Sequence, residues 1–151
     1  MEINGVAHTF ITAGDFERSV AFYRQLLPFL GLQEVADSPD TYYCVGGRTG
    51  FGIRRPDPAH ADARYAQFRV GSLHHQCWRV RDRSDIDEAH AFLVSIGAKI
   101  VHAPQDEPWA PGYYSVLFED PDGIRLELNH VPGRGLFDTP TQRVGASLDA
   151  R

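Results

Sequence analysis

The sequence predicts an α+β fold made of two βαβββ modules, because the chain repeats one pattern of elements. His8 and His75 each lie in a short β-rich run, and an aspartate follows each of them by seven positions, at Asp15 and Asp82. The two histidines are therefore separated by the same interval as the two aspartates. A helical pattern follows each aspartate, and three strand-like runs follow each helical pattern. Each copy therefore predicts the order βαβββ.

The helix of each copy is predicted by apolar side chains at helical spacing. A glycine ends each pattern, Gly31 in the first copy and Gly97 in the second, as is typical of a helix C-terminus. The apolar stripes consist of Phe16, Val20, Tyr23 and Leu27 in the first copy and of Ala89, Phe92, Leu93 and Ile96 in the second.

The strand-like runs and turn residues predict one domain over residues 1–131. The three runs are 32–35, 41–45 and 51–54 in the first copy and 99–103, 113–119 and 124–130 in the second. Module one then spans residues 4–56, a polar, proline-rich linker spans 57–72, and module two spans 73–131. Residues 132–151 have no sustained period and are predicted to form a C-terminal tail.

Composition narrows the classes of function. The formal net charge of −5 argues against a protein that binds the nucleic-acid backbone, which normally has a basic face. The apolar stretches fall far short of the roughly 18 residues that a membrane helix needs. Two cysteines are too few for a disulfide framework and suit a reducing compartment. We therefore expect a cytoplasmic protein with neither nucleic acid nor membrane as a partner.

Strand alternation places polar side chains on the face that the helices leave open. Glu127 lies opposite the apolar residues of the last strand, and His8 and His75 lie on the first strand of each copy. Two imidazoles and one carboxylate can form a facial metal site with open coordination positions. Alternation sends His74 to the other face. Hydrogen-bonded core histidines and a solvated glutamate are the ordinary alternative.

The sequence also resembles a known family, the vicinal oxygen chelate superfamily of glyoxalases, bleomycin-resistance proteins and extradiol dioxygenases. The likeness covers residues 4–131 and rests on His8, on the run D-F-E-R-S-V-A-F-Y at 15–23, on His74 and His75, and on D-P-D-G-I-R-L-E-L at 120–128. It implies a U-shaped, eight-stranded partial barrel with flanking helices around a divalent metal. It assigns the metal to His8, His75 and Glu127, with His75 preferred to His74 because only His75 keeps the seven-residue interval to Asp82.

One departure from the family bears on the reaction. Members like glyoxalase I carry a fourth ligand, a glutamate, on the last strand of the first module. The matching place here is Ile53 or Arg54, so that carboxylate is missing. A set of two histidines and one glutamate resembles ring-cleaving dioxygenases or fosfomycin-modifying transferases instead.

The resemblance implies a metal-dependent enzyme that chelates two neighbouring oxygens of a small-molecule substrate. Fe²⁺ or Mn²⁺ would serve a dioxygenase, and Zn²⁺, Ni²⁺ or Mn²⁺ would serve a lyase or transferase. A metal-free protein that binds or sequesters a drug-like molecule is the alternative. Family members commonly pair, so a homodimer is expected.

Further site residues are predicted around this centre. Arg54 and Arg125 are candidates for binding an anionic group. His60, in the linker ahead of His75, is the candidate for moving a proton at neutral pH. Aromatic side chains are expected to wall the pocket or to pack in the core, namely Tyr43, Trp109, Tyr113 and Tyr114.

Overall fold

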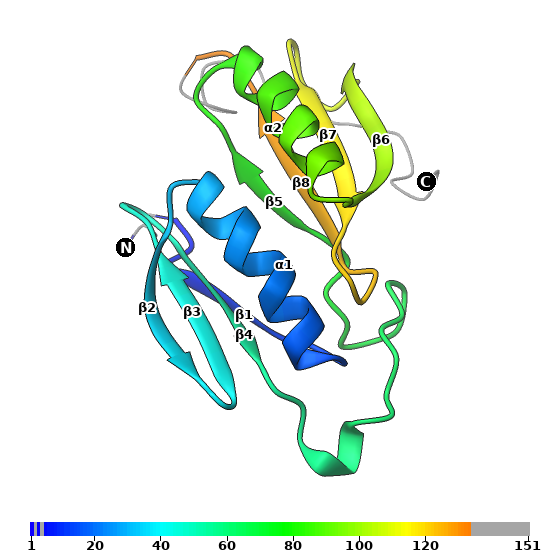
Figure 1. Cartoon of the computed structure of the whole chain (residues 1–151). Helices are drawn as coiled ribbons and strands as arrows, with labels where there is room; N and C mark the ends of the chain where they lie inside the picture. The colour runs from blue at the N-terminus through cyan, green and yellow to red at the C-terminus, as the bar shows by residue number, and fades with distance from the viewer. Residues whose placement is uncertain (2, 4, 134–151) are drawn as a thin grey trace.

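The computed structural model describes residues 1, 3 and 5–133, and it contains the two predicted modules (Figure 1). The first consists of β1 (His8–Thr12), α1 (Phe16–Phe29), β2 (Gln33–Ser38), β3 (Thr41–Val45) and β4 (Gly50–Arg54). The second consists of β5 (Gln76–Arg79), α2 (Arg83–Ser95), β6 (Lys99–Asp106), β7 (Tyr114–Glu119) and β8 (Arg125–His130). A short 3-10 helix, η1 (Pro58–His60), lies in the linker. The predicted tail, apart from its first two residues, lies outside the described residues.

The two sheets have the same topology. Their strand orders are β1-β4-β3-β2 and β5-β8-β7-β6. The first strand of each module pairs in parallel with the last, and the remaining pairs are antiparallel. The sheets are not closed into a barrel, which agrees with the expected partial barrel. The α+β prediction is therefore confirmed.

The repeated aspartates begin the two helices. Asp15 is the N-cap of α1, and its carboxylate accepts a hydrogen bond from the backbone N–H of Arg18. Asp82 is the N-cap of α2, and its backbone N–H donates to the carboxylate of Asp85. Both contacts satisfy N–H groups that would otherwise lack a partner at a helix start. The sequence repeat thus includes a capping position as well as a histidine.

Both helices cover the same side of the molecule, and one hydrophobic core runs beneath them (Figure 1). Phe29 of α1 stacks on Phe92 of α2 with ring centroids 3.9 Å apart. Phe51 of β4 packs edge-on against Trp78 of β5 at 5.1 Å. The modules therefore share their core, and each sheet keeps its second face open.

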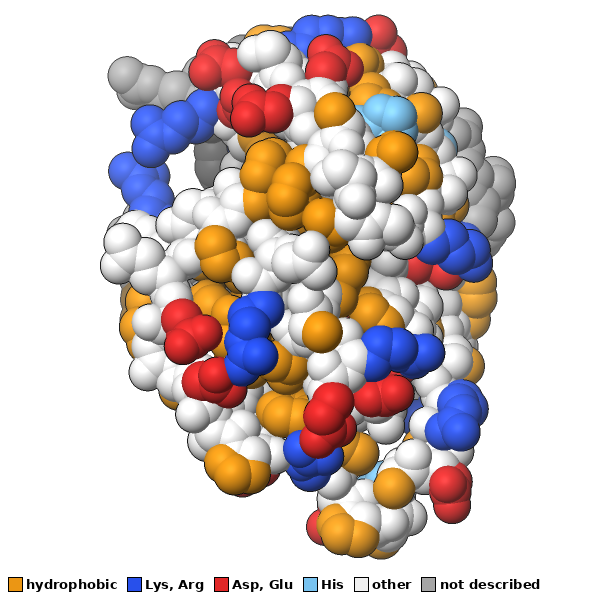
Figure 2. Space-filling view, in the orientation of Figure 1, with side chains coloured by type: hydrophobic (Ala, Val, Ile, Leu, Met, Phe, Trp, Pro, Cys, Tyr) orange, Lys and Arg blue, Asp and Glu red, His pale blue; other side chains and the backbone are white. Residues whose placement is uncertain are grey.

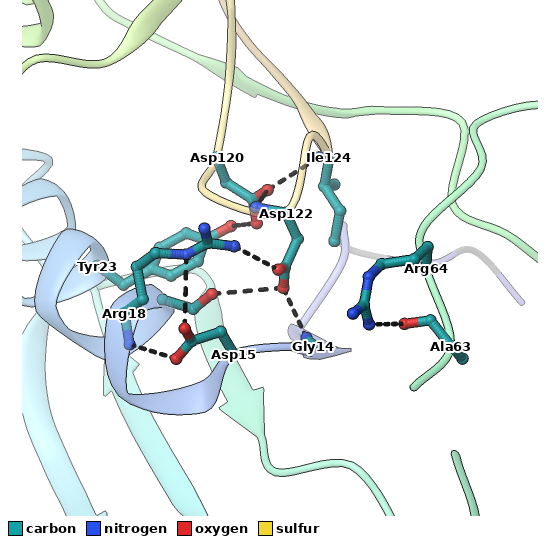
Figure 3. Close-up of polar contacts among 10 residues, drawn as sticks. Gly14, Asp15, Arg18, Tyr23, Ala63, Arg64, Asp120, Asp122 and Ile124 are labelled. Carbon is teal, nitrogen blue, oxygen red and sulfur yellow. Dashed lines mark hydrogen bonds and ion pairs between the residues drawn. The ribbon is translucent and has the colours of Figure 1, made fainter. Parts of the chain in front are cut away.

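A polar clamp also joins the modules (Figure 3). Asp120 and Asp122 lie in the turn between β7 and β8, and they reach the middle and the start of α1 respectively. The Tyr23 hydroxyl donates to Asp120 Oδ2 at 2.8 Å. Asp122 Oδ2 accepts from the backbone N–H of Gly14 at 2.7 Å, and Asp122 Oδ1 pairs with Arg18 at 3.2 Å. The D-P-D-G segment is thus a tight turn, as its residues predict, and also a contact between modules.

The face that carries the helices has a mixed charge. Figure 2 shows acidic and basic side chains interspersed on this side, with apolar patches between them. A basic stripe of the kind that follows a phosphate backbone is not visible on this face of the described chain. Among the described residues, none of the helices is both long and apolar enough to cross a membrane.

Candidate metal-binding site on the open face of the second sheet

Alternation along β8 separates the core from the candidate site. Leu126 and Leu128 are fully buried in the core. Glu127 points to the opposite, open face, and its side chain is 12% exposed. His75 lies just before β5, the strand that pairs with β8, and its Nε2 atom is 3.7 Å from Glu127 Oε2. The fold thus brings together two of the three predicted ligands, which lie far apart along the chain.

Burial favours the neutral forms of the titratable groups around this pair. Burial lowers the pKa of His75, which favours the neutral imidazole that binds metal ions, although the nearby Glu127 carboxylate acts in the opposite direction. Tyr113 donates a hydrogen bond to Glu127 Oε1 at 2.7 Å, and burial raises the pKa of its phenol. Burial also raises the pKa of the neighbouring Cys77 thiol to about 12. Tyr113 is therefore a neutral donor that fixes one oxygen of Glu127.

His8 lies on the open face of the first sheet. Its ring makes edge contacts with Phe10 at 5.6 Å and with Tyr43 at 6.4 Å between centroids. Among the described residues, no three histidine, cysteine, aspartate or glutamate side chains come together as a metal site. One chain therefore assembles the His75–Glu127 pair and leaves His8 apart from it.

The sheet register shows which residue of the first module is the counterpart of Glu127. Cys77 of β5 pairs with Glu127 of β8, and Phe10, the residue that matches Cys77 in the first copy of the repeat, pairs with Gly52 of β4. Gly52 is therefore the counterpart of Glu127, and the expectation of Ile53 or Arg54 at this place was wrong. A Cβ atom at Gly52 would lie 2.1 Å from Cε1 of Phe10, so the Phe10 ring occupies this place.

The remaining predicted residues are distributed over both sheets. Arg125 lies two residues before Glu127 on β8 and so on the same face. Tyr43 lies near His8 and stacks on Phe10 at 4.9 Å. Arg54 is exposed and lies 3.8 Å from Asp40, and the half-buried Trp109 lies in the loop between β6 and β7.

Tyr114 and His60 lie away from the His75–Glu127 pair. The Tyr114 hydroxyl donates to Asp87 on α2 at 2.8 Å, which places this side chain on the helix side of the sheet. His60 lies in η1 and lines a hollow of about 1520 Å³ between the linker and the end of β1. Neither His75 nor Glu127 lines this hollow.

His74 is a residue whose position the sequence argument missed. Strand alternation sends it away from the site, but β5 begins only at Gln76, so alternation does not apply to His74 and His75. The two rings instead meet, with their Nδ1 atoms 2.8 Å apart. The adjacent histidines just before a strand were the sequence feature that could have indicated this contact.

Comparison with known proteins identifies the family of this chain. The sequence model of the glyoxalase/bleomycin resistance protein/dioxygenase superfamily matches residues 5–128. The chain belongs to this superfamily. The resemblance noted from the sequence is therefore confirmed.

Several known proteins are similar to this chain over most of its length. The uncharacterized protein YqjT of Bacillus subtilis is 26% identical over 130 residues, which cover 80% of this chain and 94% of YqjT. The metallothiol transferase FosB of Shouchella clausii is 24% identical over 127 residues, which cover 84% of this chain and 80% of FosB. The structure of lactoylglutathione lyase from Agrobacterium tumefaciens shares the fold, with a TM-score of 0.64, 22% identity, and coverage of 86% of this chain and 96% of the lyase.

Proposed function

We propose that this chain is a divalent-metal-dependent enzyme that acts on a small molecule with two neighbouring oxygen atoms. The observation that carries this proposal is the His75–Glu127 pair on the open face of the second sheet, with 3.7 Å between Nε2 and Oε2. We assign the third ligand to His8 of a second copy of the chain, because one chain keeps its own His8 apart from this pair. The proposed enzyme is therefore a homodimer with shared sites.

The donor set fits a divalent metal. A neutral imidazole and a carboxylate suit Fe²⁺, Mn²⁺, Zn²⁺ and Ni²⁺, and a site with two histidines and one glutamate keeps positions open for a chelating substrate. Tyr113 donates a hydrogen bond to Oε1 of Glu127, the oxygen that does not face His75. Carboxylates that bind metal ions are commonly held by such hydrogen bonds. A metal bound there would act as a Lewis acid that stabilises negative charge on the substrate oxygens.

The other side chains favour particular reactions. Arg125 shares a face with Glu127 and can bind an anionic group of the substrate. Gly52 stands where the first module would carry a fourth carboxylate, so the first sheet lacks a glutamate there that could move a proton. We therefore favour dioxygenase or transferase chemistry over the reaction of a four-ligand lactoylglutathione lyase.

A second candidate function is metal-free binding of a drug-like molecule. Phe10 and Tyr43 stack at 4.9 Å over a floor of two glycines, Gly50 and Gly52, on the open face of the first sheet. Phe10 is 43% exposed. Such an aromatic surface can bind a planar or apolar molecule without a metal.

Metal analysis of protein purified without oxygen tests the two functions against each other. We expect a dimer by light scattering that holds one metal ion per chain, because each dimer would form two sites. The rival function predicts a protein that stays metal-free after incubation with Fe²⁺, Mn²⁺, Zn²⁺ and Ni²⁺ and still binds apolar ligands. A monomer mass that does not change with concentration would contradict the shared site.

The linker histidine gives a separate prediction. We expect His60→Ala to leave metal affinity unchanged, because η1 lies on the hollow beside β1 and away from the His75–Glu127 pair. Once a substrate is found, the pH profile of turnover for His60→Ala decides its predicted catalytic role. A rate and profile equal to those of the parent would remove His60 from the reaction and direct attention to Tyr113.

A further inference from the structure

A chain of contacts leads from the linker to His75. The side-chain amide nitrogen of Gln67 lies 3.2 Å from Nε2 of His74. Nδ1 of His74 lies 2.8 Å from Nδ1 of His75. Nε2 of His75 then faces Glu127. The ring centroids are 5.1 Å apart while the Nδ1 atoms are only 2.8 Å apart, so each ring directs a nitrogen at the other.

The linker holds His74 from several sides. The Phe68 ring makes an edge contact with the His74 ring at 5.3 Å between centroids. The hydroxyl of Tyr65 donates to the carbonyl oxygen of Leu73 at 2.6 Å, which fixes the backbone just before His74. Together with Gln67, these residues give His74 a defined orientation although it lies outside a strand.

The hydrogen-bond chain restricts the tautomers of both histidines. A neutral imidazole has one N–H group and one lone pair. If His75 gives the lone pair of Nε2 to a metal ion, its proton must lie on Nδ1 and point at His74. Nδ1 of His74 must then accept, so its own proton lies on Nε2 and points at Gln67. The Gln67 amide accepts this proton when it flips to turn its oxygen toward the ring.

We infer that His74 is a positioning residue that sets the ring orientation and tautomer of His75, and that Gln67 of the linker sets His74 in turn. This inference rests on the proposed function, because His75 acts there as a metal ligand. Ligating histidines are commonly oriented through their second nitrogen, and loss of such a partner typically weakens metal binding about 10- to 100-fold. In most proteins that partner is a carboxylate, a carbonyl or a water. Here it is a second imidazole that the linker holds.

Titration calorimetry with Zn²⁺ on the metal-free dimer tests the inference. We expect His74→Ala to weaken binding about 10- to 100-fold and His74→Asn to recover most of the affinity, because the amide oxygen can accept from Nδ1 of His75. Gln67→Glu should bind at least as tightly as the parent, since a carboxylate accepts the His74 proton without flipping. His90→Ala on α2 removes an imidazole elsewhere and serves as the matched control.

Nuclear magnetic resonance with ¹⁵N-labelled histidine gives a readout that needs no metal. A hydrogen bond between the two Nδ1 atoms should produce a coupling between their nitrogens in the metal-free protein, and His74→Ala should abolish it. With Zn²⁺ bound, His75 should carry its proton on Nδ1 and His74 on Nε2. These spectra also decide the case in which His74→Ala does not fold.

The outcomes separate the inference from the proposed function. A parent protein that binds none of the metals overturns the proposed function and with it the role of His74. A parent that binds Zn²⁺, together with a His74→Ala variant whose affinity lies within about twofold of the parent, overturns the inference alone. Absence of the coupling between the imidazoles also overturns it.

Discussion

Replacing Glu127 by Gln, or His75 by Ala, is expected to weaken divalent-metal binding by more than about 100-fold while the dimer stays folded. Each change removes a carboxylate or imidazole donor from a site that has few donors. The core beneath is untouched, because Leu126 and Leu128 on the same strand point the other way. Calorimetry and metal analysis measure the affinity, and circular dichroism checks the fold. Glu119→Gln, a change of a carboxylate on β7 that pairs with Lys99, is the matched control.

The shared site makes a sharper prediction for dimers of two different chains. His8→Ala and Glu127→Ala homodimers should each bind no metal. A mixed dimer of the two variants should bind one ion, because the His8→Ala chain supplies His75 and Glu127 and its partner supplies His8. Chains with different affinity tags allow the mixed dimer to be isolated. A mixed dimer without metal would place all three ligands in one chain and overturn the shared site.

The sequence predicted the fold well because each level of the pattern agreed. A histidine, an aspartate, an apolar helix stripe and a glycine stop recur in the same order in both copies, so local preferences and the repeat predicted the same elements. The register between the strands was harder to predict from the sequence. The pairings of β1 with β4 and of β5 with β8 show that Gly52 is the counterpart of Glu127, whereas position along the chain alone predicts Ile53 or Arg54.

The candidate site was predicted in part. Alternation on β8 correctly placed Glu127 on the open face because that residue lies inside a regular strand. The same rule failed for His74 because β5 starts at Gln76, and before that point the linker decides where the rings lie. The contact of Tyr113 with Glu127 joins a loop to a strand, and its geometry depends on tertiary packing that a sequence pattern does not report.

The D-P-D-G turn also makes stabilising contacts that its sequence pattern does not report. Its residues predict a tight turn, and that prediction is local. Its side chains reach the first module, far earlier in the chain, through contacts between Asp120 and Tyr23 and between Asp122 and Gly14 (Figure 3). A pattern typical of a turn thus also fixes the two modules against each other.

Removing the Asp120 side chain is expected to cost about 3–5 kcal/mol of the free energy of unfolding, through several buried groups that lose partners together. Asp120 Oδ1 accepts from the backbone N–H groups of Asp122 and Ile124, and Oδ2 accepts from the Tyr23 hydroxyl. Tyr23 is fully buried, so its hydroxyl would have no water to replace the lost acceptor. Urea unfolding of Asp120→Ala measures the loss. Asp106→Asn, which changes an exposed pair with Arg83, should cost far less, because solvent screens such a pair.

Tyr23→Phe tests the same clamp through pH. Burial raises the pKa of Asp120 above its usual range, while the hydrogen bond from Tyr23 acts in the opposite direction. A folded-state pKa above the unfolded value means that stability falls as pH rises through the folded pKa. Without the hydroxyl that pKa rises further, so Tyr23→Phe should cost about 2 kcal/mol at pH 7 and clearly less below about pH 3, where Asp120 is protonated in both states. Acid-sensitive ion pairs elsewhere affect the free energy of unfolding of parent and variant equally, so they cancel when the two free energies are subtracted. A penalty that is the same at both pH values would show that the hydroxyl does not stabilise an ionised Asp120.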